Sequence, residues 1–328
     1  MKTLSYCLFL VILNLANLEA YMIHQKGPIA QEWKEENLSP FDELMISWNA
    51  ARPREGKFLF YVSVKTEQWS PWLLYASWGS DGQSSFSSTT EEAPVKVYQD
   101  ALEVMKGKKA TAFQIKIITE DGASLNGIHG LHVYTNGDKA QEPQKLVSCS
   151  TPIYLKVPGL SQVTVDHIRH RDLCSPTSTT AITRYLSNDY TIDPVSFAQN
   201  VWDSKFDIFG NWVFNVAQAS THLGCEWNCW VERLNGFDNI YQHLIQGNPV
   251  VISVRGPLSG STQPYANGHL LAVIGYDSLN QKVMCMDPAF PIDNETHVSY
   301  DLSNLVQAWS RRGNVAYVFS KNNNYKVR

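Results

Sequence analysis

The chain has 328 residues, of which 27 are Lys or Arg and 31 are Asp or Glu, so its formal net charge at neutral pH is −4. It has no run of basic residues that could follow a phosphate backbone, which argues against a nucleic-acid-binding protein. A hydrophobic fraction of 44% is ordinary for a globular chain, and about 300 residues usually divide between two domains.

The first twenty residues have the layout of a secretory signal peptide. Lys2 precedes an apolar stretch, and small and polar residues follow up to Ala20. The stretch is short for a transmembrane helix, and no later segment approaches the roughly 18 apolar residues that a span needs. We expect removal of residues 1–20 and a secreted or periplasmic protein with no membrane span. An uncleaved membrane anchor is the alternative.

Residues 21–155 are expected to form an all-β domain. Short runs rich in β-branched and aromatic residues alternate with turn residues, and the runs 58–65 and 113–118 show the period of two that is typical of strands. The polar segment 79–85 suits a loop. Strands are expected at 43–50, 57–66, 69–78, 95–104, 111–120 and 128–136. Their number and spacing predict a β-sandwich.

Three tryptophans of this domain, Trp69, Trp72 and Trp78, are candidates for a binding groove. Aromatic side chains in a sandwich more often build the core or the edges. Both uses stay open. If the domain binds a partner through these side chains, we expect a cell-surface or glycan ligand.

A change of pattern near residue 155 marks a second domain at 156–328. Turn residues at 136–145 and 157–162 separate the two parts. Helices are expected at 175–187, 193–203, 211–224 and 237–247, and strands at 249–256, 269–277, 282–289 and 315–321. Helices that precede an antiparallel sheet predict an α+β domain.

Cysteine usage indicates that at least one thiol stays reduced. After signal removal, five cysteines remain: Cys149, Cys174, Cys225, Cys229 and Cys285. An odd number in an oxidising compartment leaves one cysteine unpaired or in an intermolecular bridge. The sequence does not give the connectivity, and Cys285, on an apolar strand, is also a candidate for a buried free thiol.

Cys174 is the candidate nucleophile. It precedes Ser175, a good N-cap residue, and Pro176, a residue favoured at the first helical position, so we expect it just ahead of a helix. The unpaired N–H groups and the dipole of a helix N-terminus favour an anion and lower the pKa of a thiol. The position therefore suits a reactive thiolate, although many helices begin after an inert cysteine.

His269 and Asp287 are candidates for a general base and for the residue that orients it. His269 opens an apolar strand, and the next strand ends at Asp287. If the two strands form a hairpin that turns around Ser278 and Leu279, both side chains lie at the same end. An Asp there accepts the ring N–H of the histidine and supports the imidazolium. Alone, each of the two residues more often belongs to a surface or a turn.

A metal site is an alternative use of some of these residues. His167, His170 and Cys174 lie close in sequence, and Cys225 and Cys229 follow. The C-x-x-x-C spacing has no matching second pair, and the segment around the two histidines equally suits a solvated loop of mixed charge. We therefore expect no metal and no other cofactor.

The second part of the chain resembles a family of secreted bacterial enzymes. The resemblance rests on CSPTS at the expected helix start, GNW at 210–212, GNPVVISV at 247–254, GHLLAVIGYD at 268–277, DPA at 287–289 and a closing W…VAYV. In this order they are similar to the motifs of C39-like cysteine peptidases of the papain-like superfamily. The match spans nearly all of 155–320, and the first part looks like the β-sandwich module of some exported bacterial relatives.

This resemblance implies a papain-like fold with a Cys–His–Asp triad. Carried over to this sequence, it implies that Cys174 is the nucleophile, His269 the base and Asp287 the orienting residue. The order of the three residues along the chain agrees with the order in the family.

The resemblance also implies residues around the triad. A glutamine upstream of the nucleophile donates to the oxyanion in the family, and Gln162 matches it, at a longer distance from Cys174 than is typical. The motifs also place Trp212 and Gly268 at the substrate-binding cleft.

Together these expectations describe an α+β papain-like cysteine peptidase domain at 156–328, preceded by an all-β sandwich domain at 21–155 and a signal peptide at 1–20. The expected activity is cleavage of amide bonds in a peptide or protein substrate through an acyl-enzyme. One alternative is an amidase or acyltransferase with the same triad. The other is a catalytically inactive secreted binding protein.

Overall fold

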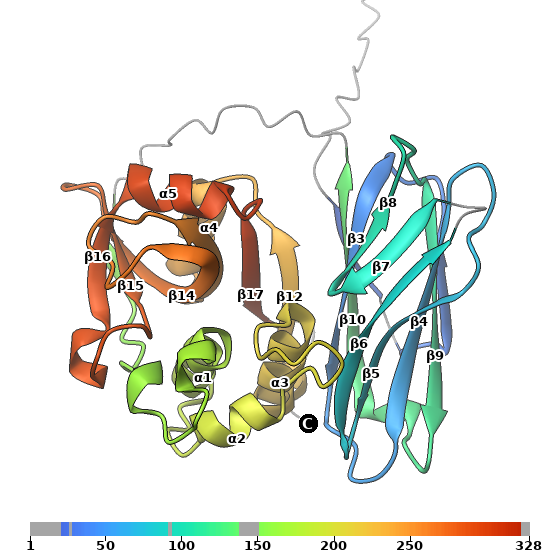
Figure 1. The fold of residues 1–328 in the computed structure, drawn as a ribbon, viewed down its shortest axis with the longest axis horizontal. Coiled ribbons are helices and arrows are strands. Elements are labelled where there is room, and N and C mark those ends of the chain that lie inside the picture. Colours follow the sequence, from blue (N-terminus) through green and yellow to red (C-terminus); the bar gives the residue numbers. More distant parts are fainter. Residues whose placement is uncertain (1–20, 26–27, 91–93, 138–150, 323–328) are drawn as a thin grey trace, which may run out of the picture.

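The computed structural model of the chain describes residues 21–25, 28–90, 94–137 and 151–322. The expected signal peptide at 1–20 and Cys149 lie outside these residues. Within them, no helix is both long and apolar enough to cross a membrane. The described residues form a β part and a mixed α/β part, which lie side by side (Figure 1).

The first part is one antiparallel sheet of ten strands, in the order β1-β10-β3-β8-β7-β6-β5-β4-β9-β2. The strands are β1 (Tyr21–His24), β2 (Glu32–Glu35), β3 (Phe41–Ala50), β4 (Lys57–Lys65), β5 (Leu73–Gly79), β6 (Gly82–Thr90), β7 (Val95–Gln99), β8 (Ala101–Val104), β9 (Ala112–Glu120) and β10 (Ile128–Gly137). Each expected strand is present. The run 95–104 is divided into two strands, because the chain turns at Asp100.

The sheet curls because β6 changes partner along its length. Residues 82–85 pair with β5, and residues 86–90 pair with β7. The two halves of the sheet face each other across an aromatic core, in which the ring of Trp48 on β3 stacks on that of Phe60 on β4 with centroids 4.2 Å apart. Trp78 is fully buried in this core and is not available to a ligand groove.

The expectation that 79–85 forms a loop is wrong in its second half, where β6 begins. The inward side chains of this strand are Gln83 and Ser85, which are buried although polar. They bond to the second part of the chain: Gln83 Nε2 donates to the carbonyl of Trp202 at 2.6 Å, and the backbone N–H of Ser85 donates to Asp203 at 3.2 Å. Because the buried side chains of β6 are polar and are paired with hydrogen-bond partners, the sequence of this strand shows no hydrophobic alternation.

The second part is built on an antiparallel sheet of seven strands, in the order β12-β17-β13-β14-β15-β16, with β11 paired to β14. The strands are β11 (Ile153–Tyr154), β12 (Trp227–Arg233), β13 (Val250–Gly256), β14 (Tyr265–Asp277), β15 (Lys282–Met286), β16 (His297–Asp301) and β17 (Val315–Lys321). The helices are α1 (Cys174–Ser187), α2 (Pro194–Gln199), α3 (Trp212–Leu223), α4 (Phe237–Ile245) and α5 (Leu302–Ser310). The strands β12 and β16 and the helix α5 were not expected from the sequence.

Helices cover both faces of this sheet. Leu270 and Ala272 of β14 pack in one cluster with α1 and α3, whereas Leu271 and Val273 pack in another with α4 and α5. Figure 1 shows the two groups of helices on opposite sides of the strands. A strand buried on both faces reads as a continuous apolar run, which explains why β14 shows no alternation.

The two parts share one hydrophobic core. Buried residues of the first sheet, of α1 and of α3 belong to a single cluster, and the ring of Trp48 lies 6.0 Å from that of Phe214 on α3. The expected boundary at 155 therefore marks a change of topology and not a gap between cores. The strand β11, just before that boundary, already pairs with the second sheet.

Side chains of β3 occupy the free edge of β12, the outermost strand of the second sheet. Asn49 Nδ2 donates to the carbonyl of Cys229 at 2.6 Å, and Asn49 Oδ1 accepts from the Cys229 N–H at 2.8 Å. Ser47 Oγ accepts from the N–H of Val231 at 3.0 Å. These bonds satisfy backbone groups that the edge of a sheet would otherwise leave unpaired.

Arg52 forms a second junction between the parts. Its guanidinium donates to the carbonyls of Gly79 at 2.7 Å and Asn200 at 2.6 Å, and to the side chains of Gln83 and Gln218 at 3.1 to 3.4 Å. All these acceptors are neutral. Burial lowers the pKa of Arg52 to about 10, and the group stays charged at neutral pH.

Candidate active site

Cys174 is the first residue of α1. The expectation that Ser175 caps this helix is wrong, because the N-cap position is Leu173, whose side chain makes no capping hydrogen bond. The Ser175 hydroxyl is instead 2.9 Å from that of Tyr317 on β17, which ties the start of the helix to the second sheet. Pro176 lies in the first turn, where a missing N–H removes no intrahelical bond.

His269 and Asp287 meet at one end of a hairpin. The strands β14 and β15 are antiparallel and are joined by a turn at 278–281. His269 Nε2 lies 2.8 Å from Asp287 Oδ1, and both residues are buried. The carboxylate therefore holds one nitrogen of the ring in place, which leaves the other nitrogen, Nδ1, for a second partner.

That second partner is the thiol of Cys174, which is hydrogen-bonded to the ring of His269. Burial opposes the charged imidazole, but Asp287 and the thiol outweigh it and raise the pKa of His269 to about 10. Burial also opposes the thiolate, but His269 and the backbone N–H groups of Leu270 and Ser175 lower the pKa of Cys174 below its usual value. The two shifts favour a thiolate–imidazolium pair.

Two tyrosines that sequence reasoning missed complete the site. The hydroxyls of Tyr265 and Tyr300 donate to Asp287 Oδ2 at 2.8 Å and 2.7 Å, and the N–H of Ala289 donates to Oδ1 at 3.0 Å. The ring of Tyr265 also stacks on that of His269, with centroids 4.0 Å apart. Burial alone would raise the pKa of Asp287, but His269 and these donors lower it. The carboxylate stays ionised without contact with water.

Replacing Tyr265 and Tyr300 together by phenylalanine should weaken the thiolate. Without two of its donors Asp287 has a higher pKa, takes up a proton more readily and supports the imidazolium less. We expect the acid limb of the pH profile of Cys174 alkylation to move up by about one pH unit. The measurement is the rate of reaction with iodoacetamide. The exposed Tyr190→Phe is the control, and an unmoved profile would contradict this role of the tyrosines.

The side-chain amide of Gln162 is turned to the loop that leads into Cys174. Its Nε2 donates to the carbonyls of His170 at 3.2 Å and Arg171 at 2.8 Å, and the side chain is buried. Both amide hydrogens are therefore used, and none is left for an oxyanion. In this structure Gln162 holds the loop that leads into Cys174.

Trp212 and Gly268 both lie near the side chain of Arg312. Trp212 begins α3, and its backbone N–H donates to Asp100 of the first part at 3.1 Å. Gly268 precedes His269 and has a φ of 100°, which a residue with a side chain rarely adopts. The Nε and Cζ atoms of Arg312 lie 3.7 Å and 3.8 Å from the position that a Cβ of Gly268 would take.

All four described cysteines are free thiols. Cys229 and Cys285 are buried, whereas Cys174 and Cys225 are partly exposed. Burial raises the pKa of Cys229 and Cys285, so these two are poor nucleophiles. In the described part of the chain, no group of three or more His, Cys, Asp or Glu side chains could hold a metal ion.

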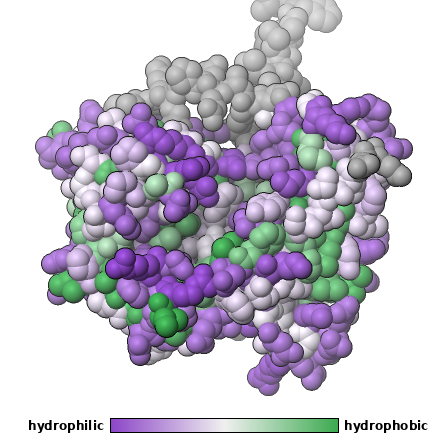
Figure 2. All heavy atoms as spheres, viewed as in Figure 1, coloured by the Kyte–Doolittle hydropathy of each residue, from purple (hydrophilic) through white to green (hydrophobic). Residues whose placement is uncertain are grey.

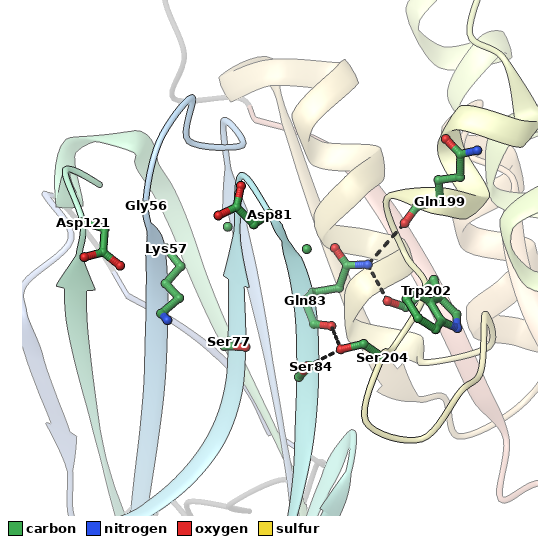
Figure 3. Close-up of a pocket in the computed structure, with 12 residues that line it drawn as sticks. Gly56, Lys57, Ser77, Asp81, Gln83, Ser84, Asp121, Gln199, Trp202 and Ser204 are labelled. Carbon is green, nitrogen blue, oxygen red and sulfur yellow. Dashed lines mark hydrogen bonds between the residues drawn. The ribbon is translucent and has the colours of Figure 1, made fainter.

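A pocket of about 350 Å³ lies elsewhere, at the junction of the two parts. Figure 3 shows it between the hairpin that carries Asp81 and Gln83 and the segment that carries Trp202 and Ser204. Its walls are largely polar, and Gln83 is bonded to the opposite wall. It contains neither Cys174 nor the pair of residues beside it.

The second part of the chain matches a known family. A model described as the Peptidase_C39 like family matches residues 154–317, which are 164 of the 328 residues, or half of the chain. Among solved structures, a C39-like peptidase candidate from Bacillus anthracis is 19% identical, with a TM-score of 0.41, over 52% of this chain and 98% of that chain. No curated protein was found to match. By the extent of the family match, the chain belongs to the Peptidase_C39 like family.

Proposed function

We propose that the protein is a cysteine peptidase in which Cys174, His269 and Asp287 act together. The observation that carries this proposal is the continuous contact from the thiol to the imidazole and from the imidazole to a buried carboxylate. A nucleophile, a base and a group that orients the base are what acyl transfer from an amide requires.

The reaction begins with attack of the Cys174 thiolate on the carbonyl carbon of a peptide bond. The new C–S bond converts the carbonyl oxygen to an oxyanion, which accepts from the backbone N–H of Cys174 in the first turn of α1, where no intrahelical acceptor exists. His269 gives its proton to the leaving amine as the C–N bond breaks. Water, deprotonated by His269, then hydrolyses the thioester and regenerates the thiol.

Gln162 has a different part in this proposal from the one its motif implies. Its amide fixes the carbonyls of His170 and Arg171, and these residues determine where the chain enters α1. Gln162 therefore positions Cys174 and its N–H, and the oxyanion relies on the backbone.

The substrate in this proposal is a peptide or a protein, as is usual for a C39-like peptidase. Export to a secreted or periplasmic location also belongs to the proposal and rests on residues 1–20 alone. A glycan or cell-surface ligand of the first part has no support among the described residues, where Trp69 and Trp72 lie under the ammonium groups of Lys34 and Lys116.

The pH dependence of thiol alkylation tests the state of the nucleophile without a known substrate. Because the pKa of Cys174 is lowered, iodoacetamide should modify it at mildly acidic pH. The buried Cys229 and Cys285, whose pKa values are raised, should stay unmodified, and Cys225 serves as the partly exposed reference. The modified residue is found by mass spectrometry of peptides. Preferential modification of Cys225 at pH 6, with Cys174 unreactive, would contradict the proposal.

A further inference from the structure

Arg312, in the turn between α5 and β17, is half-buried beside the proposed active site. Its Nε donates to the hydroxyl of Ser253 at 3.2 Å. Among the described residues, no protein group accepts a hydrogen bond from its two terminal amino groups. Neighbouring Arg233 differs, because its guanidinium binds both oxygens of Glu43 and two backbone carbonyls.

The guanidinium of Arg312 lies next to Gly268, the residue that precedes the proposed base. The space above Gly268, which precedes His269, is bounded by the Nε and Cζ atoms of Arg312. Tyr317, whose hydroxyl meets that of Ser175 at 2.9 Å, is close enough to sense the charges of both Cys174 and Arg312. A group held by Arg312 would therefore lie beside Gly268, the neighbour of His269, and within electrostatic range of the residues around Cys174.

Trp212 supports the arginine from the side. The guanidinium carbon of Arg312 lies 5.6 Å from the centre of its indole ring, and the guanidinium carbon of Arg233 lies 5.9 Å from it. A guanidinium beside an aromatic ring keeps its planar N–H groups free for a two-pronged contact. Trp212 itself is fixed by its backbone bond to Asp100.

The local charge is positive. Asp100 attracts Arg312, and its carboxylate accepts from the Trp212 N–H. Burial raises the pKa of Asp100 to about 6, so this carboxylate is mostly ionised at neutral pH and offsets one positive charge. Arg255 and Arg233 add further positive charge close by. Arg233 is neutralised by Glu43, whereas no carboxylate of the described residues forms an ion pair with Arg312. In the view of Figure 2, hydrophilic and hydrophobic residues are mixed over the surface of the second part.

We propose that Arg312, supported by Trp212 and Ser253, forms a subsite for a carboxylate of the substrate next to the scissile bond. The carboxylate belongs either to an acidic side chain or to a free C-terminus, since both offer two coplanar oxygens to the guanidinium fork. This subsite rests on the proposed function, which it deepens by naming a substrate class. It gives the site a preference for anionic peptides.

Alkylation by two reagents that differ in charge tests the subsite. Iodoacetate and iodoacetamide react alike: the thiolate forms a C–S bond, and iodide leaves. Only iodoacetate carries a carboxylate. In Arg312→Gln the rate of Cys174 modification by iodoacetate should fall about tenfold, while the rate with iodoacetamide should change less than about twofold. Arg312→Lys, which keeps the charge, should restore most of the difference.

Arg184→Gln is the matched control, because Arg184 lies on the same helix as Cys174, ten residues further along, or about 15 Å. Equal changes for both reagents in Arg312→Gln, or no change for either, would overturn the subsite. Slow modification by both reagents in the unmodified protein would instead contradict the proposed function. The circular dichroism spectrum shows whether each variant is folded.

Protection from alkylation separates the two sources of the carboxylate. N-acetylated peptides are compared in pairs that differ by Glu against Gln inside the chain, or by a free acid against an amide at the C-terminus. In the pair that identifies the source, the peptide with the carboxylate protects Cys174 better than its neutral counterpart, and Arg312→Gln removes this difference. Equal protection within both pairs would count against the subsite.

Discussion

Replacing Cys174 by alanine should abolish peptide hydrolysis and leave the fold intact. The thiol is the only described nucleophile in contact with the His269 ring, so its loss removes the acyl-enzyme route, and we expect turnover to fall by about 10³-fold or more. Loss of one small, partly exposed sulfur leaves little cavity. The measurement is turnover of a panel of protein and peptide substrates under reducing conditions, with the circular dichroism spectrum as a check on folding.

Further variants define the mechanism in the same assay. His269→Ala should be nearly as severe, because it removes both the base and the acid. Asp287→Ala should be milder, because Asp287 exchanges no proton with the substrate. Cys225→Ala, the matched control, should keep full activity.

Three results would change the interpretation. Turnover that survives Cys174→Ala contradicts the mechanism. Transfer to an added amine, or cleavage of non-peptide amides alone, points to the acyltransferase or amidase alternative. Absence of any turnover, together with tight binding of a surface ligand by the full chain, points to a binding protein.

Replacing Arg52 by alanine should lower the free energy of unfolding by about 3 kcal/mol. The guanidinium satisfies carbonyls and amide side chains of both parts of the chain, and its loss leaves largely buried acceptors unpaired at a cost of about 1–3 kcal/mol each. The cation also lies 4.5 Å from the ring centre of Trp78, a contact that disappears with it. Urea denaturation followed by tryptophan fluorescence measures the effect.

Arg54→Ala is the control for this variant. Arg54 is exposed, lies two residues further along the same segment and has the same charge, so its loss should change the free energy of unfolding by less than about 0.5 kcal/mol. If both variants unfold at the same urea concentration, the junction at Arg52 contributes no stability.

The residues of the proposed triad could be found from the sequence because their signals are local. Cys174 precedes a helical pattern, and His269 and Asp287 lie on consecutive strands joined by a short turn, so strand pairing alone brings them together. Tyr265 and Tyr300 carry no such signal. Their hydroxyls reach Asp287 only when three strands are assembled, and β16, which bears Tyr300, was not expected at all.

The arrangement of the two parts could not be predicted from the sequence, for a related reason. A hydrophobic pattern indicates which face of a strand is buried, but not what covers it. The strands of the first part were expected to cover one another, yet the cluster that contains Trp48 also contains Phe214. In β6 and β12 the contacts that decide the structure are hydrogen bonds to the other part, which leave no periodic signal.

The bonds of Asn49 and Ser47 to β12 bear on how the second part of the chain would behave in isolation. A fragment that starts at residue 151 would present the unpaired edge of a strand next to an apolar surface from which the first sheet has been removed. Such edges recruit other chains. The fragment should associate with copies of itself as its concentration rises, and a shorter form of the protein would need another cover for that edge.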